Sequence, residues 1–149
     1  MREALTQQMR LALDNAQRAA RRLNQDFVGT EHLLLGVLEC EAGEAVWTLR
    51  ANEVPVAELR RRLLQGLPAG DQAPVVTGNL PLSPRATRII NAAQVLAQRL
   101  REPQVSTRLA LLAFLEEPGS SVRQAFLDSG ADLDELMRVL AEKPCEAEA

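Results

Sequence analysis

The sequence predicts an all-α fold made of two tandem four-helix repeats, eight helices in all, with pseudo-two-fold symmetry. Three observations predict it. Apolar residues recur at helical spacing through most of the 149 residues. Aromatic residues make up only 3% of the chain, so the core must consist of Leu, Ala, Val and Ile, which suits closely packed helices. The second half of the chain also repeats the apolar pattern of the first.

A long amphipathic helix is predicted at the start of the chain. Its apolar stripe follows helical spacing and consists of Leu5, Met9, Ala12, Leu13, Ala16, Ala19, Ala20 and Leu23. Arg10 and Arg18 lie off this stripe, among Gln, Asn and Asp residues. This mixture favours a solvated face, and a basic docking face is the functional alternative.

The stretch from Val28 to Glu39 is the centre of the first repeat. Its run of leucines and valines is apolar all round, which predicts a short helix buried on most sides. We expect the Thr30 hydroxyl to cap this helix and the Glu31 carboxylate to be favoured by its dipole. Gly36 predicts the close approach of a neighbouring helix.

Two further helices complete the first repeat. Residues 44–52 are predicted to be helical with Ala45 and Leu49 inward, and Pro55 opens the next helix. That helix is lined by Val56, Leu59, Leu63 and Leu64 and stops at Gly66. Residues 67–81 have the Gly and Pro content of a linker. The first repeat is therefore placed at residues 3–66.

The second repeat, residues 82–142, copies the first at an offset of 77 positions. The shifted stripe falls on apolar residues throughout, namely Leu82, Ala86, Ile89, Ile90, Ala93, Leu96, Ala97 and Leu100. A single offset without a gap indicates an internal duplication. Helix boundaries are expected at Ser83–Pro84, Pro118–Gly119, Gly130 and Asp132. Residues 1–142 then form one domain, and 143–149 are predicted to be a flexible tail.

Composition and motifs exclude several classes of function. A net charge of -3 argues against a nucleic-acid binder. No P-loop pattern is present, so ATP hydrolysis is not expected in this chain. The chain is also expected not to be an enzyme of another kind. His32, the only histidine, is interpreted as a hydrogen-bonded helix residue, and no Cys/His spacing suggests zinc. No cofactor or metal is therefore expected.

The chain is expected to be a monomeric cytoplasmic domain. It has neither a signal-peptide pattern nor a membrane-spanning apolar run. Cys40 and Cys145 do not form a disulfide framework, and a half-buried structural thiol is predicted at Cys40. Trp47, the only tryptophan, corresponds to Gln124 in the second copy. It is therefore expected near the surface, either anchoring a partner or lying over the edge of the core.

Two motifs carry a resemblance to a known family. Residues 27–39, Phe-Val-Gly-Thr-Glu-His-Leu-Leu-Leu-Gly-Val-Leu-Glu, resemble the signature of the Clp repeat. Residues 82–90, Leu-Ser-Pro-Arg-Ala-Thr-Arg-Ile-Ile, are similar to the start of the family's second repeat. Two such repeats form the N-terminal domain of the Clp/Hsp100 AAA+ unfoldases, and this chain is most similar to the ClpC and ClpA branch. The resemblance extends over residues 3–142.

The resemblance implies a docking module that binds adaptor or substrate proteins for a Clp ATPase or protease. It also implies a site for phosphorylated arginine at Gly29, Thr30 and Glu31, because some ClpC domains recognise that group. The start of the central helix would attract the phosphate, and the Glu31 carboxylate would pair with the guanidinium. A simple helix cap at Thr30 and Glu31 is the alternative.

The second copy departs from the family pattern at Ser106, Thr107 and Arg108. Arg108 stands where a carboxylate is expected and would repel a guanidinium, so this site is expected to be degenerate. Arg108 is expected either to hold an acidic partner or to pair with a local glutamate.

Two function hypotheses follow. One is a Clp docking domain, either excised from a longer ATPase or stand-alone, with Trp47, Arg10 and Arg18 as a possible partner surface. The other is a regulatory helical protein without a Clp partner that binds another protein, or binds DNA through Arg10, Arg18 and Arg60–Arg62.

Overall fold

A computed structural model describes residues 4–75, 77–117, 121–144 and 146–149, which include eight α-helices. The helices are α1 (Gln7–Arg22), α2 (Thr30–Leu38), α3 (Glu44–Ala51), α4 (Val56–Gly66), α5 (Pro84–Arg99), α6 (Thr107–Glu116), α7 (Ser121–Asp128) and α8 (Leu133–Leu140). Within these residues there are two isolated β-bridges and no strand longer than a bridge. The all-helical prediction is confirmed.

The backbone repeats at the offset found in the sequence. The helix pair α1 and α5, and the pair α3 and α7, have the same bounds once 77 positions are added. The hydroxyls of Thr6 and Ser83 cap α1 and α5 in the same way, each accepting from the third residue of its helix. Asn24 and Arg101, equivalent residues after these helices, both have positive φ angles, 55° and 58°.

Two backbone bridges join the repeats symmetrically. Leu5 pairs with Val105, and Val28 pairs with Leu82. Leu5 and Val28 of the first repeat are the equivalents of Leu82 and Val105 in the second, so each bridge is the symmetry copy of the other. This exchange holds the entry of each central helix, α2 or α6, beside the entry of the other repeat's first long helix.

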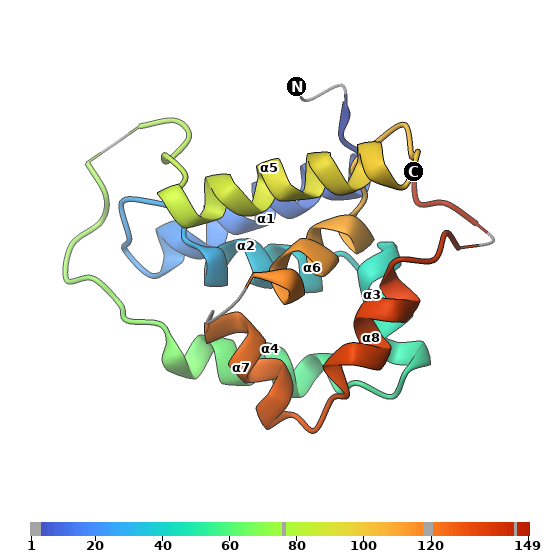
Figure 1. The fold of residues 1–149 in the computed structure, drawn as a ribbon. Coiled ribbons are helices and arrows are strands. Elements are labelled where there is room, and N and C mark those ends of the chain that lie inside the picture. The colour runs from blue at the N-terminus through green and yellow to red at the C-terminus, as the bar shows by residue number, and fades with distance from the viewer. Residues whose placement is uncertain (1–3, 76, 118–120, 145) are drawn as a thin grey trace.

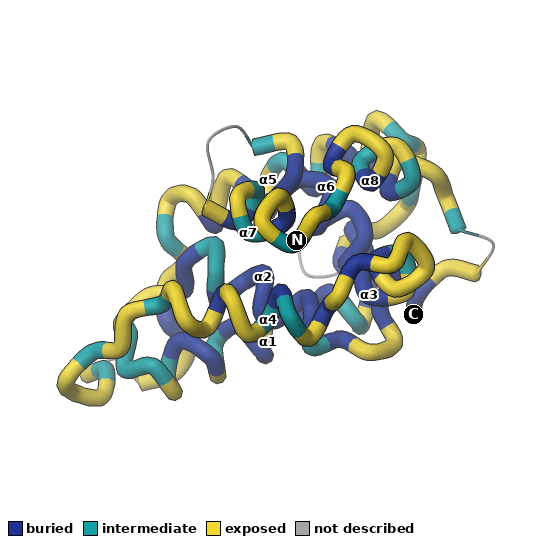
Figure 2. Tube along the Cα trace, turned by 90° about the horizontal axis from the view of Figure 1, so that it is seen from below, coloured by how far each residue is buried: buried dark blue, intermediate teal, exposed yellow. Residues whose placement is uncertain are grey.

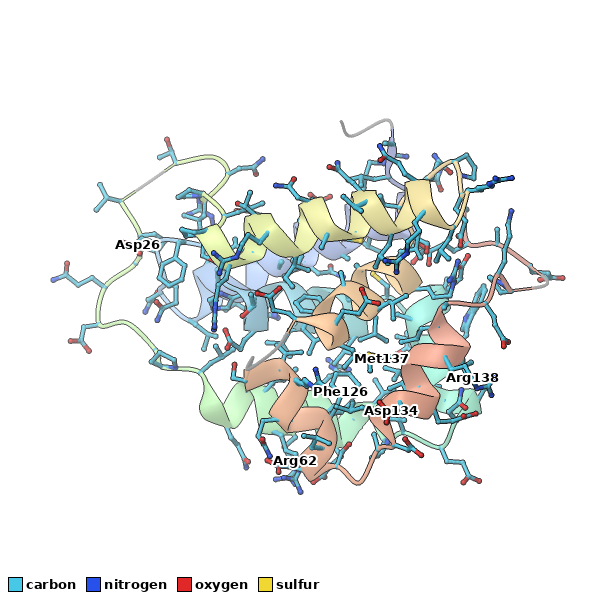
Figure 3. All side chains as sticks on the ribbon, in the orientation of Figure 1. Asp26, Arg62, Phe126, Asp134, Met137 and Arg138 are labelled. Atoms are coloured by element: carbon cyan, nitrogen blue, oxygen red, sulfur yellow. The ribbon has the colours of Figure 1, made fainter. Side chains whose placement is uncertain are left out.

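The core is centred on α2 and α6. Figure 1 shows α1 and α5 along the upper side, α2 and α6 in the middle, and the other four helices below. Figure 2 shows the buried residues gathered between the two halves. Leu34 and Leu111, the equivalent leucines of the central helices, are both fully buried. In Figure 3, Phe126 on α7 points into this interior, whereas Arg62 and Arg138 lie at the surface.

Gly36 allows α1 and α2 to touch. A Cβ at this position would lie 2.2 Å from the backbone oxygen of Ala12 and 2.9 Å from the backbone nitrogen of Ala16. Real Cβ atoms do not approach so closely, so only glycine fits between these two helices. The predicted close approach at Gly36 is confirmed.

Some boundaries differ from the predictions. Pro55 is the N-cap of α4 rather than a residue of its first turn. Leu64 is 48% exposed, while Val56, Leu59 and Leu63 are buried as predicted. The boundary expected at Pro118–Gly119 lies outside the described residues. In the described part of the chain, no helix is both long and apolar enough to cross a membrane.

Candidate functional site

The first turn of α2 is capped by a different residue from the one predicted. Gly29, not Thr30, is the N-cap, and Thr30 is the first helical residue. The Thr30 hydroxyl donates a hydrogen bond to Glu31 Oε2 at 3.2 Å. His32 Nδ1 accepts from the Gly29 N–H at 2.9 Å, so the imidazole takes over the capping of this turn.

His32 is a structural residue, as predicted. Its side chain is buried, and its Nε2 atom has no hydrogen-bond partner among the described residues. Burial lowers the pKa of His32, although the nearby charge of Glu31 opposes the shift. A neutral imidazole suits this position because its unprotonated Nδ1 must accept a hydrogen bond.

Glu31 presents a half-buried carboxylate beside the start of α2. Ser121 of α7 donates to Glu31 Oε1, and Thr30 donates to the other oxygen. Burial raises the pKa of Glu31, but hydrogen bonds from Ser121, the backbone and Thr30 outweigh it and hold the pKa below its usual value. The carboxylate is therefore charged near neutral pH.

A small hollow lies beside Thr30, the first residue of α2. It is lined by Thr30 of α2, Arg85 and Ile89 of α5, Phe114 and Glu117 at the end of α6, and Val122 of α7. Three helices from the second repeat thus meet the first-repeat motif. The hollow brings together the N-terminus of α2, the exposed Arg85 and the carboxylate of Glu117, which are groups that can bind an anion and a cation together.

The equivalent position in the second repeat is closed. Arg108 is 1% exposed, and its Nε donates to Glu44 Oε1 at 2.9 Å. Its terminal nitrogens donate to Glu102 and to the backbone oxygen of Leu140. Of the two expectations for Arg108, pairing with a local glutamate is confirmed.

Ser106 and Thr107 are also buried and hydrogen-bonded. Ser106 caps α6 by accepting from the Leu109 N–H at 3.3 Å. The Thr107 N–H donates to the carboxylate of Glu148 at 2.8 Å, and the Thr107 hydroxyl donates to the same carboxylate. Residues 143–149 were expected to form a flexible tail, but the structure buries Glu148 at 6% exposure. Its carboxylate is drawn in because helix N–H groups are available there.

The residues proposed as a partner surface lie on different helices. Trp47 of α3 is 41% exposed, as its polar counterpart Gln124 suggested, and its indole donates to the backbone oxygen of Glu41. Arg10 and Arg18 are on α1, and Arg18 donates to the side chain of Asn15. No hydrogen bond or ring contact among the described residues joins Trp47 to either arginine.

The Arg60–Arg62 run does not form an open basic patch. Arg61 and Arg62 both pair with Glu58, at 2.6 and 3.1 Å. The Arg60 Nε atom is buried without a hydrogen-bond partner among the described residues. Arg60 lines a groove of about 270 Å³ between α1 and α4, whose other walls include Ala19, Leu23, Leu35 and Leu64.

Cys40 is more buried than predicted. It has no exposed surface, and its sulfur lies 3.4 Å from the backbone oxygens of both Gly36 and Gln8, which are alternative acceptors for its single S–H. Burial, and then the charges of Glu148 and Glu39, raise the pKa of Cys40 to about 12. The thiol is therefore an inert core group.

Sequence reasoning missed two buried acidic residues, Glu44 and Glu148, and the partly buried Glu102. Glu44 and Glu148 are 3% and 6% exposed. The sequence analysis assigned no role to Glu44 or Glu102, and it placed Glu148 in the predicted flexible tail. The one available signal was Arg108, since a buried arginine requires carboxylate partners.

Comparison with known proteins decides the family. The model of the Clp repeat (R) N-terminal domain matches residues 4–129. This chain belongs to the Clp repeat N-terminal domain family. It is 29% identical over 125 residues to a ClpA homolog of Trieres chinensis, named as an ATP-binding subunit of the ATP-dependent Clp protease. It is 32% identical over 118 residues to the chloroplastic chaperone ClpC2 of Oryza sativa subsp. japonica.

The match covers most of this chain and a small part of each relative. The aligned region is 84% of this chain and 14% of the Trieres chinensis protein, and 78% and 12% for the rice protein. Solved Clp N-domains share the fold. The N-terminal domain of ClpD from Arabidopsis thaliana has a TM-score of 0.74 at 18% identity, covering 94% of this chain and 96% of that one. The N-domain of ClpV from Vibrio cholerae has a TM-score of 0.76 at 18% identity, and the match covers 93% of this chain and 86% of the ClpV domain.

Proposed function

We propose that this Clp N-type domain binds substrate or adaptor proteins for a Clp ATPase or protease, and that the start of α2 binds phosphorylated arginine. Membership of the family supports the docking role. One solved neighbour is a complex of the ClpV N-domain with a VipB peptide, at a TM-score of 0.72. The relatives that match in sequence include Clp protease ATP-binding subunits and Clp chaperones.

The observation that carries the phosphoarginine proposal is the charged carboxylate of Glu31 at the N-terminus of α2. A guanidinium would pair with this carboxylate, replacing or joining the hydroxyl donors Ser121 and Thr30. The attached phosphate would lie toward the helix N-terminus and Arg85, both of which favour an anion. The buried Arg108 leaves the second repeat without an equivalent carboxylate, so one site per chain is proposed.

Isothermal titration calorimetry with free phosphoarginine tests this site. The unmodified chain should bind at a stoichiometry of one, and Glu31→Ala should abolish the heat. Glu41→Ala is a matched control, because Glu41 is an exposed glutamate elsewhere in the same repeat. If the unmodified chain gives no binding heat, the phosphoarginine site is rejected while the docking role stands.

Capture from native lysate tests the docking role separately. The immobilised chain should retain a Clp ATPase, a Clp protease subunit or one of their adaptors, identified by mass spectrometry. A variant carrying Trp47→Ala measures whether the exposed indole contributes to this capture. Absence of all three classes of protein would reject the proposed docking role.

The alternative of a DNA-binding regulator finds less support. Glu58 pairs with two of the three arginines in the Arg60–Arg62 run, and the chain is acidic overall at -3. Retention of DNA that weakens with salt, together with no Clp protein in the lysate experiment, would favour this alternative.

A further inference from the structure

The N-termini of three helices converge on the segment that follows α8. In α1, the Gln8 N–H donates to the backbone oxygen of Ala149 at 3.1 Å. The N–H groups of Glu44 and Thr107, the first residues of α3 and α6, each donate to the Glu148 carboxylate at 2.8 Å. Each helix N-terminus carries a positive partial charge, so an anion is favoured where the three meet.

Two buried hydroxyls complete this site. Thr6, which is 5% exposed, and Thr107, which is fully buried, both donate to the Glu148 carboxylate. The carboxylate thus accepts four hydrogen bonds from three separate segments. We call the two N–H groups of Glu44 and Thr107 and the two threonine hydroxyls the oxyanion cradle.

The cradle holds its anion without a direct ion pair to an arginine. Arg108 lies close by, but its guanidinium donates to Glu44, Glu102 and a backbone oxygen. The Glu44 carboxylate also accepts from the Glu148 N–H at 2.6 Å. The Glu148 side chain is therefore held by N–H and O–H donors, which are groups that also bind other oxyanions.

Gly43 brings the two repeats together at this point. A Cβ on Gly43 would lie 2.7 Å from Thr107 Oγ1, so glycine lets the start of α3 approach the start of α6. The Ala45 N–H donates to the same threonine oxygen at 3.1 Å. The cradle therefore belongs to the packing of α3 on α6, whereas its occupant comes from a separate segment of the chain.

We propose that residues 146–149 form an intramolecular strap whose Glu148 carboxylate occupies the oxyanion cradle. Displacement of the strap opens the cradle to an external oxyanion, which is a carboxylate or phosphate group on a bound protein. The Glu31 site plays no part in this inference, which concerns the first turns of α3 and α6 rather than that of α2.

Amide NMR titration of the isotopically labelled chain tests the strap. Sodium phosphate and sodium acetate are added separately at constant ionic strength to the unmodified chain, to Glu148→Ala and to Glu146→Gln. Glu146 is an exposed glutamate of the same segment, so its variant is the matched control. In Glu148→Ala the Glu44 and Thr107 amides should shift with a Kd at least tenfold lower than in the other two proteins.

The two salts distinguish the sources of the oxyanion. A response to phosphate alone assigns the cradle to phosphate groups, a response to acetate alone assigns it to carboxylates, and a response to both assigns it to either group. Each of these supports the strap. Equal Kd values in the unmodified chain and Glu148→Ala would overturn it. Unchanged chemical shifts of the Glu44 and Thr107 amides in Glu148→Ala would also overturn it, even if amides in the first turn of α2 shift.

A second variant covers the case in which Glu148→Ala does not fold, as judged by circular dichroism. Glu148→Gln keeps the size of the side chain and removes its charge. Hydrogen exchange of the Glu44 and Thr107 amides should then be at least tenfold faster than in the unmodified chain. Equal exchange rates would show that the Glu148 carboxylate does not close the cradle.

Discussion

Glu31 and Arg108 occupy equivalent positions in the two repeats, each the second residue of its central helix, and their surroundings are opposite. Glu31 is half-buried and accepts from Ser121, whereas Arg108 is 1% exposed and donates to Glu44 and Glu102. One duplicated position has thus become a half-buried carboxylate in one copy and a fully buried cation in the other. This divergence makes the two halves of the domain chemically different.

Removing the charge of Arg108 should strongly destabilise the fold. Arg108→Met leaves the buried Glu44 without its cation and should lower the free energy of unfolding by about 3–5 kcal/mol. Arg138→Met is the matched control, because Arg138 also pairs with two glutamates but is 61% exposed. Urea unfolding of both variants measures the difference. Equal midpoints would show that the buried pair is dispensable.

A methyl group at Gly36 should separate α1 from α2. Gly36→Ala would place a Cβ 2.2 Å from the Ala12 backbone oxygen, and the resulting shift should lower the free energy of unfolding by about 1–3 kcal/mol. Gly66→Ala is the control, since nothing lies within 4 Å of a Cβ there. That variant should unfold at the same temperature or slightly higher, because alanine favours a helix. Thermal unfolding followed by circular dichroism measures both variants. Equal unfolding temperatures for Gly36→Ala and Gly66→Ala would contradict the prediction.

The stability of the domain should fall as the pH drops below about 6.5, the usual pKa of histidine. Burial lowers the pKa of His32 in the folded state, so the unfolded chain binds the proton first. Stability is lost from about pH 6.5 down to the lowered folded-state pKa. Urea unfolding between pH 8 and pH 5 measures this, and proton NMR follows the single imidazole directly. His32→Gln should remove the dependence in this window, and a flat profile in the unmodified chain would contradict it.

The Cys40 thiol should be protected from alkylation in the folded domain. A pKa of about 12 leaves roughly a thousandfold less thiolate near pH 8 than an ordinary thiol has, and the side chain is fully buried. The measurement uses Cys145→Ser, so that one thiol is followed, and compares the rates in buffer and in denaturant. Comparable rates would show that the core around Cys40 opens readily.

The helices and their duplication were predictable because their causes are local. The apolar stripe of α1 and its copy in α5 follow from side chains three and four residues apart. The caps at Thr6 and Ser83 involve bonds within a single turn. The buried centre at Leu34 and Leu111 follows from a run that has no polar face.

By itself, then, the sequence determined the all-helical repeats, the two central helices and the divergence at Arg108. Only the tertiary structure decided the partners of the buried charges. Glu44 and Glu148 are 104 residues apart, and the bonds between them form only after α3 and α6 have packed together. The periodicity of the sequence cannot predict such a contact. The carboxylate is buried because the N–H groups at the helix N-termini, which are brought together only when the helices pack, donate hydrogen bonds to it.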